Sequence, residues 1–290
     1  MVPIAALAIG LALAAITAGS AQSVPAVDEL IVRVGQRVAD FYMRAKSVIC
    51  IETSTVQPID LSYSPAGFAR TVESELHLEA GSGESAAETV FVRKVRKVNG
   101  RAPRERDKKD RSGCTDPNPL SSEPLVFLLT AHRSKYVFTP AGTGKDGDRA
   151  ALMIDFESAD RRSKPALVED EGGHDDCFDW SGHIASRGRI WVDAGTHDVL
   201  RVERRLRGPV DVDVPVLIQR RYHLDPGIVI VRDEFTIRYQ AVAFSDPDEV
   251  LLLPESISTV TMIRGGLQST RRSQTFSDYR RFVTEGKVLQ

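Results

Sequence analysis

Hydrophobic side chains near the start of the chain recur at the three- and four-residue spacing of a helix. They are Val27, Leu30, Ile31, Val34, Val38, Phe41, Tyr42 and Ala45. This spacing places them on one side of an α-helix. Asp28 and Glu29 suit the first turn of that helix, and Arg44 suits the last turn. We therefore expect a long amphipathic helix whose apolar stripe packs on another element, most simply a sheet.

After this helix the hydrophobic period changes to two, which is typical of strands with one buried face. In residues 199–206, for example, leucine and valine alternate with arginine and glutamate. The segments predicted as strands are 48–56, 70–78, 89–98, 136–138, 151–156, 189–193, 199–206, 219–224, 228–243, 257–264 and 268–276. Residues 122–129 are almost entirely apolar and are predicted to form a short buried helix.

Strands do not alternate with long helices, so a parallel α/β sheet is not expected. The pattern indicates a mainly antiparallel β fold of the α+β class, with about ten strands and one long N-terminal helix. A sheet this large must curl to bury one face, and the helices are available to cover or plug it. Residues 22–290 are long enough for one core and carry no repeat or linker, so we expect a single domain.

Residues 1–21 have the character of a signal peptide. The run from Val2 to Ala18 is apolar and uncharged, and small residues at Gly19 and Ala21 suit cleavage after Ala21. The alternative is a retained transmembrane anchor, although the run is shorter than the ~20 apolar residues that a span needs. No cysteine lies at the cleavage zone for lipid attachment. We expect a periplasmic or secreted protein that does not span the membrane after cleavage.

Composition narrows the classes of function. The 290-residue chain is 42% hydrophobic and 27% charged, with a net charge of -2. Such a balance is typical of ordinary folded domains and argues against a nucleic-acid binder.

Three short segments resemble the LolA-type lipoprotein carriers and their envelope relatives. They are the hairpin formed by Gly188–Asp193 and Asp198–Glu203, and the closing segment Phe276–Phe282. The resemblance covers most of the mature chain by order of elements, but only these segments by residue. It implies a curved half-barrel with helices plugging an apolar concavity that binds a lipid, an acyl chain or a lipoprotein anchor. The chain departs from the minimal carriers in its length and in a charged stretch over 93–116, and no binding residue carries over.

Aromatic and aliphatic side chains on two predicted strands are candidates for the wall of such a cavity. They are Trp191, Phe235, Ile237 and Tyr239. The alternative is that they belong to an ordinary filled core, as aromatic residues on strands commonly do.

The chain has three cysteines, an odd number for an exported protein. Cys50 lies in an apolar predicted strand, whereas Cys114 and Cys177 lie in predicted loops. We therefore predict a disulfide between Cys114 and Cys177 and a buried, free Cys50. A loop this long would stabilise the fold by roughly 4 kcal/mol in the chain-entropy view.

A basic segment and an acidic segment surround the two loop cysteines. The basic patch comprises Arg93, Lys94, Arg96, Lys97, Lys108 and Lys109, within a run that extends to Arg111. The acidic segment around Cys177 includes Glu169, Asp170, Glu171, Asp175, Asp176 and Asp179. The predicted disulfide would bring them together, but two separately solvated loops remain an alternative. The basic run could also bind lipid headgroups or an envelope polymer.

One cluster has the residue types of a metal site. His174, Asp176 and His183, with Asp175 and Asp179 nearby, offer imidazole and carboxylate ligands. Their spacing fits no motif, so a polar surface loop is the default interpretation. The turn at 142–148 lacks the Ser or Thr of a phosphate-binding loop, and no nucleophile elbow occurs. We expect no cofactor and no enzymatic activity.

Three functions stay open. The first is an exported envelope protein that binds an apolar ligand in the concave face of a curved sheet. The second is a periplasmic protein-interaction or sensor module with a filled core and an envelope protein as partner. The third is a metal-dependent hydrolase built on residues 174–183. An empty apolar concavity favours the first, a filled interior the second, and clustered His and Asp side chains in a pocket the third.

Overall fold

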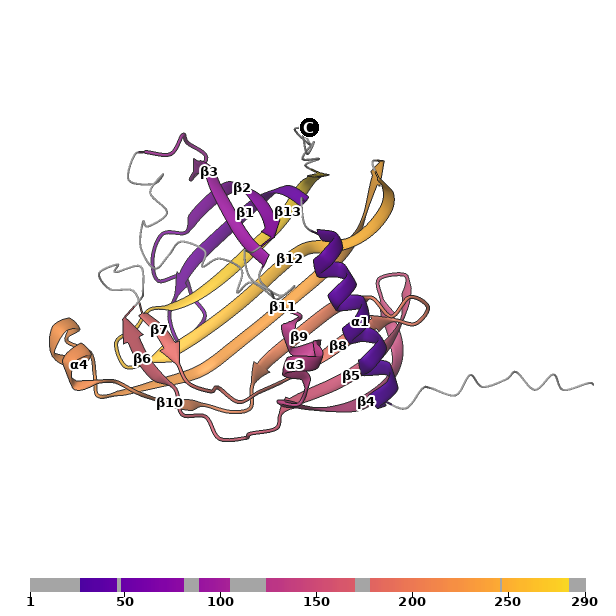
Figure 1. Cartoon of the computed structure of the whole chain (residues 1–290). Helices are drawn as coiled ribbons and strands as arrows, with labels where there is room; N and C mark the ends of the chain where they lie inside the picture. The colour runs from indigo at the N-terminus through magenta and orange to yellow at the C-terminus, as the bar shows by residue number, and fades with distance from the viewer. Residues whose placement is uncertain are drawn as a thin grey trace, which may run out of the picture.

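The computed structural model describes residues 27–45, 48–80, 89–104, 124–169, 178–245 and 247–281. Within these ranges the chain forms one large sheet, one long helix and three short helices (Figure 1).

The helices are α1 (Val27–Ala45), the 3₁₀-helix η1 (Val126–Leu128), α3 (Thr130–Arg133) and α4 (Val216–Tyr222). The strands are β1 (Val48–Ile59), β2 (Arg70–Ala80), β3 (Thr89–Val98), β4 (Tyr136–Asp146), β5 (Arg149–Ser158), β6 (Ala166–Glu169), β7 (Phe178–Ser181), β8 (Ser186–Asp193), β9 (Val199–Leu206), β10 (Val210–Asp213), β11 (Gly227–Ser245), β12 (Asp248–Arg264) and β13 (Ser269–Arg281).

The strands pair in the order β3-β2-β1-β13-β12-β11-β9-β8-β5-β4, and every pairing along this path is antiparallel. A smaller extension runs from β11 through β10 to β6 and β7. The two ends of the path, β3 and β4, do not pair with each other, so the curved sheet stays open. The predicted antiparallel α+β fold with a long N-terminal helix is confirmed.

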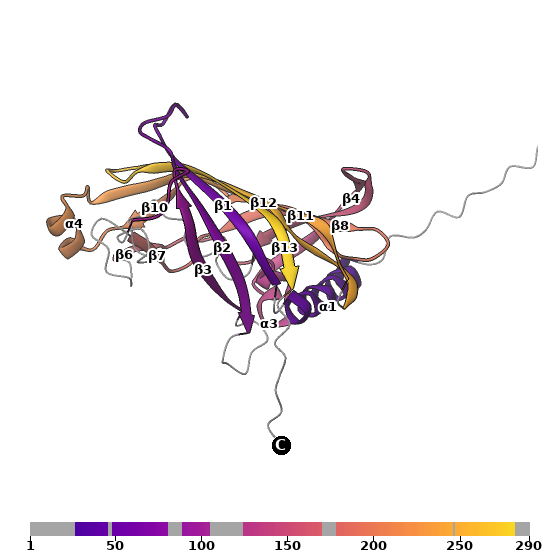
Figure 2. The same cartoon turned by 90° about the horizontal axis from the view of Figure 1, so that it is seen from above.

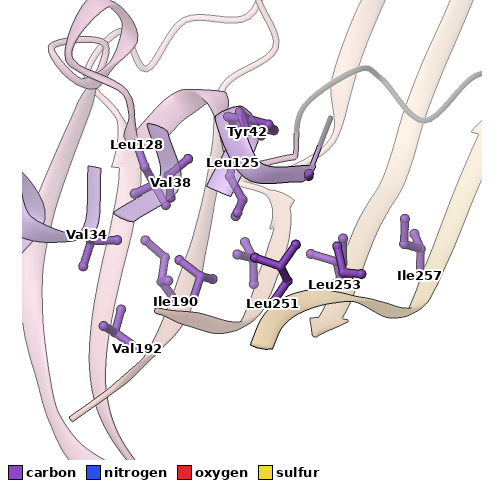
Figure 3. Packing of buried hydrophobic residues seen from close by; sticks show 14 of the residues in the cluster. Val34, Val38, Tyr42, Leu125, Leu128, Ile190, Val192, Leu251, Leu253 and Ile257 are labelled. Carbon is purple, nitrogen blue, oxygen red and sulfur yellow. The ribbon is translucent and has the colours of Figure 1, made fainter. Parts of the chain in front are cut away.

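The concave side of the sheet holds α1 and α3. In Figure 2, strands β1–β3 bend away from the long strands β11 and β12, on the side where α1 and α3 lie. The apolar stripe of α1 faces the sheet, and its residues Leu30, Ile31, Val34, Val38 and Tyr42 are buried. Figure 3 shows this stripe above the inward side chains of the strands.

The main core forms where this stripe meets the strands. Ile190 and Val192 of β8, together with Leu253 of β12, are almost fully buried against α1 and η1. Each fully buried Leu, Ile or Val contributes about 1.5–3 kcal/mol relative to an exposed one. A second core lies under α4, where Leu167, Ile228 and neighbours pack together.

Two local predictions differ from the structure. Residues 219–224 were expected as a strand, but most of them belong to α4, so that prediction is wrong. Pro215 precedes the helix, where its fixed φ is tolerated, and His223 ends the helix in the left-handed region. The helix expected at 122–129 is the short η1 within that range, followed by α3. Strands β6, β7 and β10 were not predicted.

Gly35 sets how closely α1 approaches η1. A Cβ at this position would lie 2.7 Å from the backbone oxygen of Leu128. Alanine favours an exposed helix by about 0.5–1 kcal/mol over glycine. We expect Gly35→Ala to lower the free energy of unfolding instead, by about 1–3 kcal/mol, because the methyl group would force the helices apart. Urea denaturation measures the change.

Ala39 is exposed on the same helix and provides the control. Ala39→Gly should cost about 0.5–1 kcal/mol through helix propensity alone. If Gly35→Ala instead raised stability, the close approach of α1 to η1 would not constrain the fold.

Candidate functional site

A cavity of about 440 Å³ lies along the flank of α1, and we call it the α1 cavity. Its walls come from α1, from Leu125, from the β8–β9 turn and from the far ends of β11 and β12. Its apolar lining residues are Val38, Phe41, Leu125, Val199, Tyr239, Ala241, Val250, Leu251 and Leu252. Its volume falls within the range of about 300–1,000 Å³ that is usual for small-ligand pockets.

Charged side chains border the α1 cavity and hold α1 to the strand ends. Arg37 Nε and Nη2 donate to the two carboxylate oxygens of Asp198 at 2.8 and 3.2 Å. This hydrogen bonding raises the pKa of Arg37 above its usual value. Arg44 donates to Glu249 Oε2 at 2.8 and 2.5 Å, and Arg281 also bonds Glu249. The helix is therefore fixed over the sheet by charge-assisted hydrogen bonds as well as by its apolar stripe.

Asp193 orders the turn that carries Asp198. Burial by itself would raise the pKa of Asp193, but its hydrogen bonds from the backbone amides of Thr196 and Gly195, with the charge of Arg149, hold the pKa below the usual value. Asp193 thus stays ionised and keeps the β8–β9 turn in place beside the cavity.

A second cavity, of about 270 Å³, lies on the other side of η1, and we call it the aromatic cavity. It is lined by Pro124, Val126, Phe127, His132, Lys135, Tyr136, Phe156, Val202, Arg204 and Phe235. Leu125 lines the α1 cavity whereas Val126 and Phe127 line the aromatic cavity. Residues 125–127, at the start of η1, therefore lie between the two cavities.

Three of the four side chains predicted as cavity candidates lie on the concave face. Phe235 lines the aromatic cavity, and Tyr239 lines the α1 cavity. Ile237, between them on β11, is fully buried in the main core. Burial, and then the neighbouring Tyr42, raise the pKa of Tyr239 well above its usual value, so this phenol is un-ionised at neutral pH.

The fourth candidate, Trp191, points to the opposite face. It packs with Ala151 and Leu200 in a separate apolar cluster, and the guanidinium of Arg201 lies 3.6 Å from its ring centroid. The groove beside it, about 690 Å³, is lined largely by charged side chains. Many of these are already paired with one another, as in the 2.6 Å contact between Arg189 and Asp155.

Comparison of the sequence with protein-family models and with curated proteins finds no match. Solved structures match the fold. A domain named as an outer membrane lipoprotein-sorting protein from Vibrio parahaemolyticus is 12% identical, with a TM-score of 0.37, over 87% of this chain and 94% of its own. A LolA superfamily protein from Nitrosomonas europaea is 9% identical, with a TM-score of 0.37, over 90% of this chain and 97% of its own.

The MucA/MucB complex of Pseudomonas aeruginosa also matches, with 9% identity and a TM-score of 0.25, over 88% of this chain and 100% of the matched one. The chain bears a distant LolA-like resemblance. The resemblance inferred from the sequence is thereby confirmed as a distant one, and it concerns the fold alone.

A buried polar cluster lies on the same side of strands β1, β3 and β13. Arg93 donates to Glu52 through Nε at 2.5 Å and through Nη2 at 3.0 Å. Gln274 Nε2 donates to Glu52 Oε1 at 2.7 Å. The side chains of Arg93 and Glu52 are only 7% and 1% exposed. Sequence reasoning missed this cluster, although Glu52 stands at an inward position of β1 between Cys50 and Ser54, which is the available signal.

The residues of the predicted basic patch differ in their exposure and in their partners. Arg93 points inward to Glu52, whereas Lys94 and Arg96 are exposed on β3. Lys97 forms an exposed ion pair with Glu73 at 3.0 Å. Lys108 and Lys109 lie outside the described residues. Binding of phosphate groups by the patch therefore stays a prediction.

The metal site predicted from His174, Asp176 and His183 likewise stays a prediction. His174 and Asp176 lie outside the described residues, and His183 Nε2 hydrogen-bonds the backbone oxygen of Asp160 at 2.9 Å. Among the residues that the structure places, no group of three His, Cys, Asp or Glu side chains could hold a metal ion. Within the same ranges, no helix has the length and apolarity to cross a membrane.

The buried Arg93–Glu52 pair generates a stability prediction. Arg93→Met leaves a buried carboxylate without its cation, which should cost about 3–5 kcal/mol in the free energy of unfolding. Adding Glu52→Gln removes the uncompensated charge and should recover at least half of that loss. Chemical denaturation of the single and double variants measures both.

The exposed pair on the same strand is the control. Lys97→Met should cost only about 0–1 kcal/mol, because exposed ion pairs contribute little. An equal cost for Lys97→Met and Arg93→Met would show that the inward pair is not effectively buried.

Cys50 is a buried free cysteine, and burial, followed by the charge of Glu52, raises its pKa to about 12. Folding therefore favours the protonated thiol. That stabilisation is complete below the ordinary thiol pKa of 9.0 and is lost as the pH rises toward 12. Cys114 and Cys177 lie outside the described residues, so their disulfide stays a prediction.

Thiol counting with Ellman's reagent tests both statements. The native protein at pH 8 should show no reactive thiol, because Cys50 is buried and un-ionised. Denaturation without a reductant should expose one thiol, and denaturation after reduction should expose all three cysteines. Three thiols in denaturant alone would refute the disulfide, and rapid labelling of the native protein would contradict the burial of Cys50.

Proposed function

We propose that this is an exported, non-enzymatic binding protein that takes up an apolar ligand in the α1 cavity. The ligand is a lipid, an acyl chain or the lipid anchor of a lipoprotein. The α1 cavity itself is the observation that supports this proposal, because it combines an apolar lining with a volume of about 440 Å³. The apolar run and small residues of positions 1–21 support export to the periplasm or beyond.

The walls of the cavity match an alkyl chain rather than a polar ligand. Phe41, Leu251 and Ala241 face it from the helix and from the β11–β12 hairpin. Each methylene group that moves from water to such surroundings contributes about 0.8 kcal/mol. A chain of about eight buried methylene groups would therefore gain about 6 kcal/mol before the cost of immobilisation.

The rim of the cavity suits a polar headgroup. Arg37, Arg44 and Arg149 border the cavity together with Asp40 and Asp198, so cations and anions are both present. An alkyl chain would lie inside, and its headgroup would stay among these half-exposed charges in water. This division into an apolar interior and a charged rim suits a carrier of an amphiphilic ligand.

One observation favours a second function, a protein-interaction module. Much of the concave face is already filled by α1 and η1, and the terminal strands β3 and β4 leave the sheet open. Val137 of β4 and Val92 of β3 are exposed large hydrophobic side chains on these strands. An extended partner segment could add to either edge by strand pairing.

Ala241 provides the test of the first function. Ala241→Trp places an indole in the α1 cavity and should lower the affinity for a fluorescent fatty acid at least tenfold, which corresponds to about 1.4 kcal/mol. Native mass spectrometry of the mature protein, purified from periplasm without detergent, should show bound lipid for the wild type and less for this variant.

Ala243 is the matched control, since it is an exposed alanine on the same strand that does not line the cavity. Ala243→Trp should bind the fatty acid like the wild type. A bare polypeptide mass, together with no binding of the fatty acid by the wild type, would refute the carrier function and leave the interaction module.

A further inference from the structure

We propose that the aromatic cavity is a separate site for a small anionic aromatic compound, one that carries a carboxylate or sulfonate on a ring system. This goes beyond the proposed uptake of an apolar chain, because it concerns another cavity with different chemistry. The proposal rests on two features of the lining: its rings and its charges.

Four aromatic rings contribute to the walls of the cavity. The centroids of Phe127 and Phe156 are 4.7 Å apart, and Tyr136 lies 5.4 Å from Phe127 and 6.0 Å from Phe156. Phe235 of β11 lines the cavity with them. Such rings offer both faces and edges to an incoming planar ring, in the offset and edge-to-face arrangements that aromatic pairs prefer.

Gly188 of β8 helps to place one of these rings. A Cβ at Gly188 would lie 2.6 Å from the ring of Phe156. A Cβ here would also meet the backbone oxygen of Glu203, so only glycine leaves room for the ring of Phe156 beside the strand. The position of the ring, and with it one wall of the cavity, therefore depends on the backbone of the sheet.

The charged side chains that line the cavity are of one sign. They are Lys135 and Arg204, and none of the lining residues is an Asp or a Glu, while His132 adds an imidazole. Arg204 forms a half-exposed pair with Asp233 at 3.2 Å and lies 5.6 Å from the ring centroid of Phe235. A carboxylate or sulfonate at this rim would gain charge-assisted hydrogen bonds.

The α1 cavity differs in both respects. The apolar part of its wall is mainly aliphatic, and its rim mixes Arg37, Arg44 and Arg149 with Asp40 and Asp198. Its rim therefore gives no preference for an anion. The two cavities lie on the two sides of the segment that leads into η1, so each can be filled or altered by substitution without touching the other.

The test uses two probes with the same rings. 1-Anilinonaphthalene-8-sulfonate carries a sulfonate, and N-phenyl-1-naphthylamine lacks it. We expect the wild type to bind the sulfonate at a ratio of one to one, with an affinity at least about tenfold higher than for the neutral probe, by fluorescence titration. Val126→Trp, which fills the cavity, should abolish binding of the sulfonate.

A charge-reversal variant separates the contribution of the cationic rim to binding from that of the aromatic rings. Lys135→Glu should weaken binding of the sulfonate about tenfold or more and change binding of the neutral probe less than about twofold. Lys94→Glu carries the same charge change on exposed β3, away from both cavities, and should leave both affinities unchanged. Ala241→Trp, which fills only the α1 cavity, should leave binding of the sulfonate intact.

Several outcomes overturn the proposal. Binding of the sulfonate that Val126→Trp leaves intact would place the probe elsewhere, and its loss in Ala241→Trp would assign it to the α1 cavity. Equal losses of both probes in Lys135→Glu would show that charge does not select the ligand. None of these results bears on fatty-acid uptake, which is measured separately, so failure of one site does not imply failure of the other.

Discussion

The packing of the apolar stripe of α1 on the concave sheet is the contact on which the rest of the structure depends. An open sheet has two faces, and this one does not close on itself to bury either of them. Ile190, Leu253 and their neighbours would face water without the helix. The helix needs the sheet equally, because an amphipathic helix obtains most of its stability from packing rather than from propensity. Arg37 and Arg44 then fix where along the strands the helix lies.

Both cavities follow from this packing. One helix is narrower than a sheet of this many strands, so the concave face is filled only under α1 and η1. The gap on one flank of η1 is bounded by α1 and the strand ends, and the gap on the other by α3, β4 and β5. Because different elements border the two gaps, one has aliphatic walls and a mixed rim, while the other has aromatic walls and a cationic rim. The chemistry of each cavity thus follows from the helices and strands that border it.

The sequence was sufficient to predict most of the elements but not the cavities. The 3.6-residue period of α1 and the alternation along β9 and β11 depend on local burial, which a single chain displays. The strand predicted at 219–224 failed because the Pro215 boundary and the left-handed His223 specify a helix end more strongly than the run of side chains between them. A cavity depends on gaps between segments far apart in sequence. Phe235 and Tyr239 could therefore be named as candidates, while the partners that complete each wall could not.

The polar cluster on β1, β3 and β13 divides the concave face into two parts of different chemistry. Glu52, Arg93 and Gln274 are buried on strands next to the apolar core, and they satisfy one another. A buried ion pair is stable only while its hydrogen bonds are kept, and an alkyl chain that displaced them would leave charge unpaired. The concave face therefore has an apolar part along α1 and a polar part on strands β1, β3 and β13. For the proposed uptake of an acyl chain, this division favours the apolar part beside α1 over the strands that carry the polar cluster.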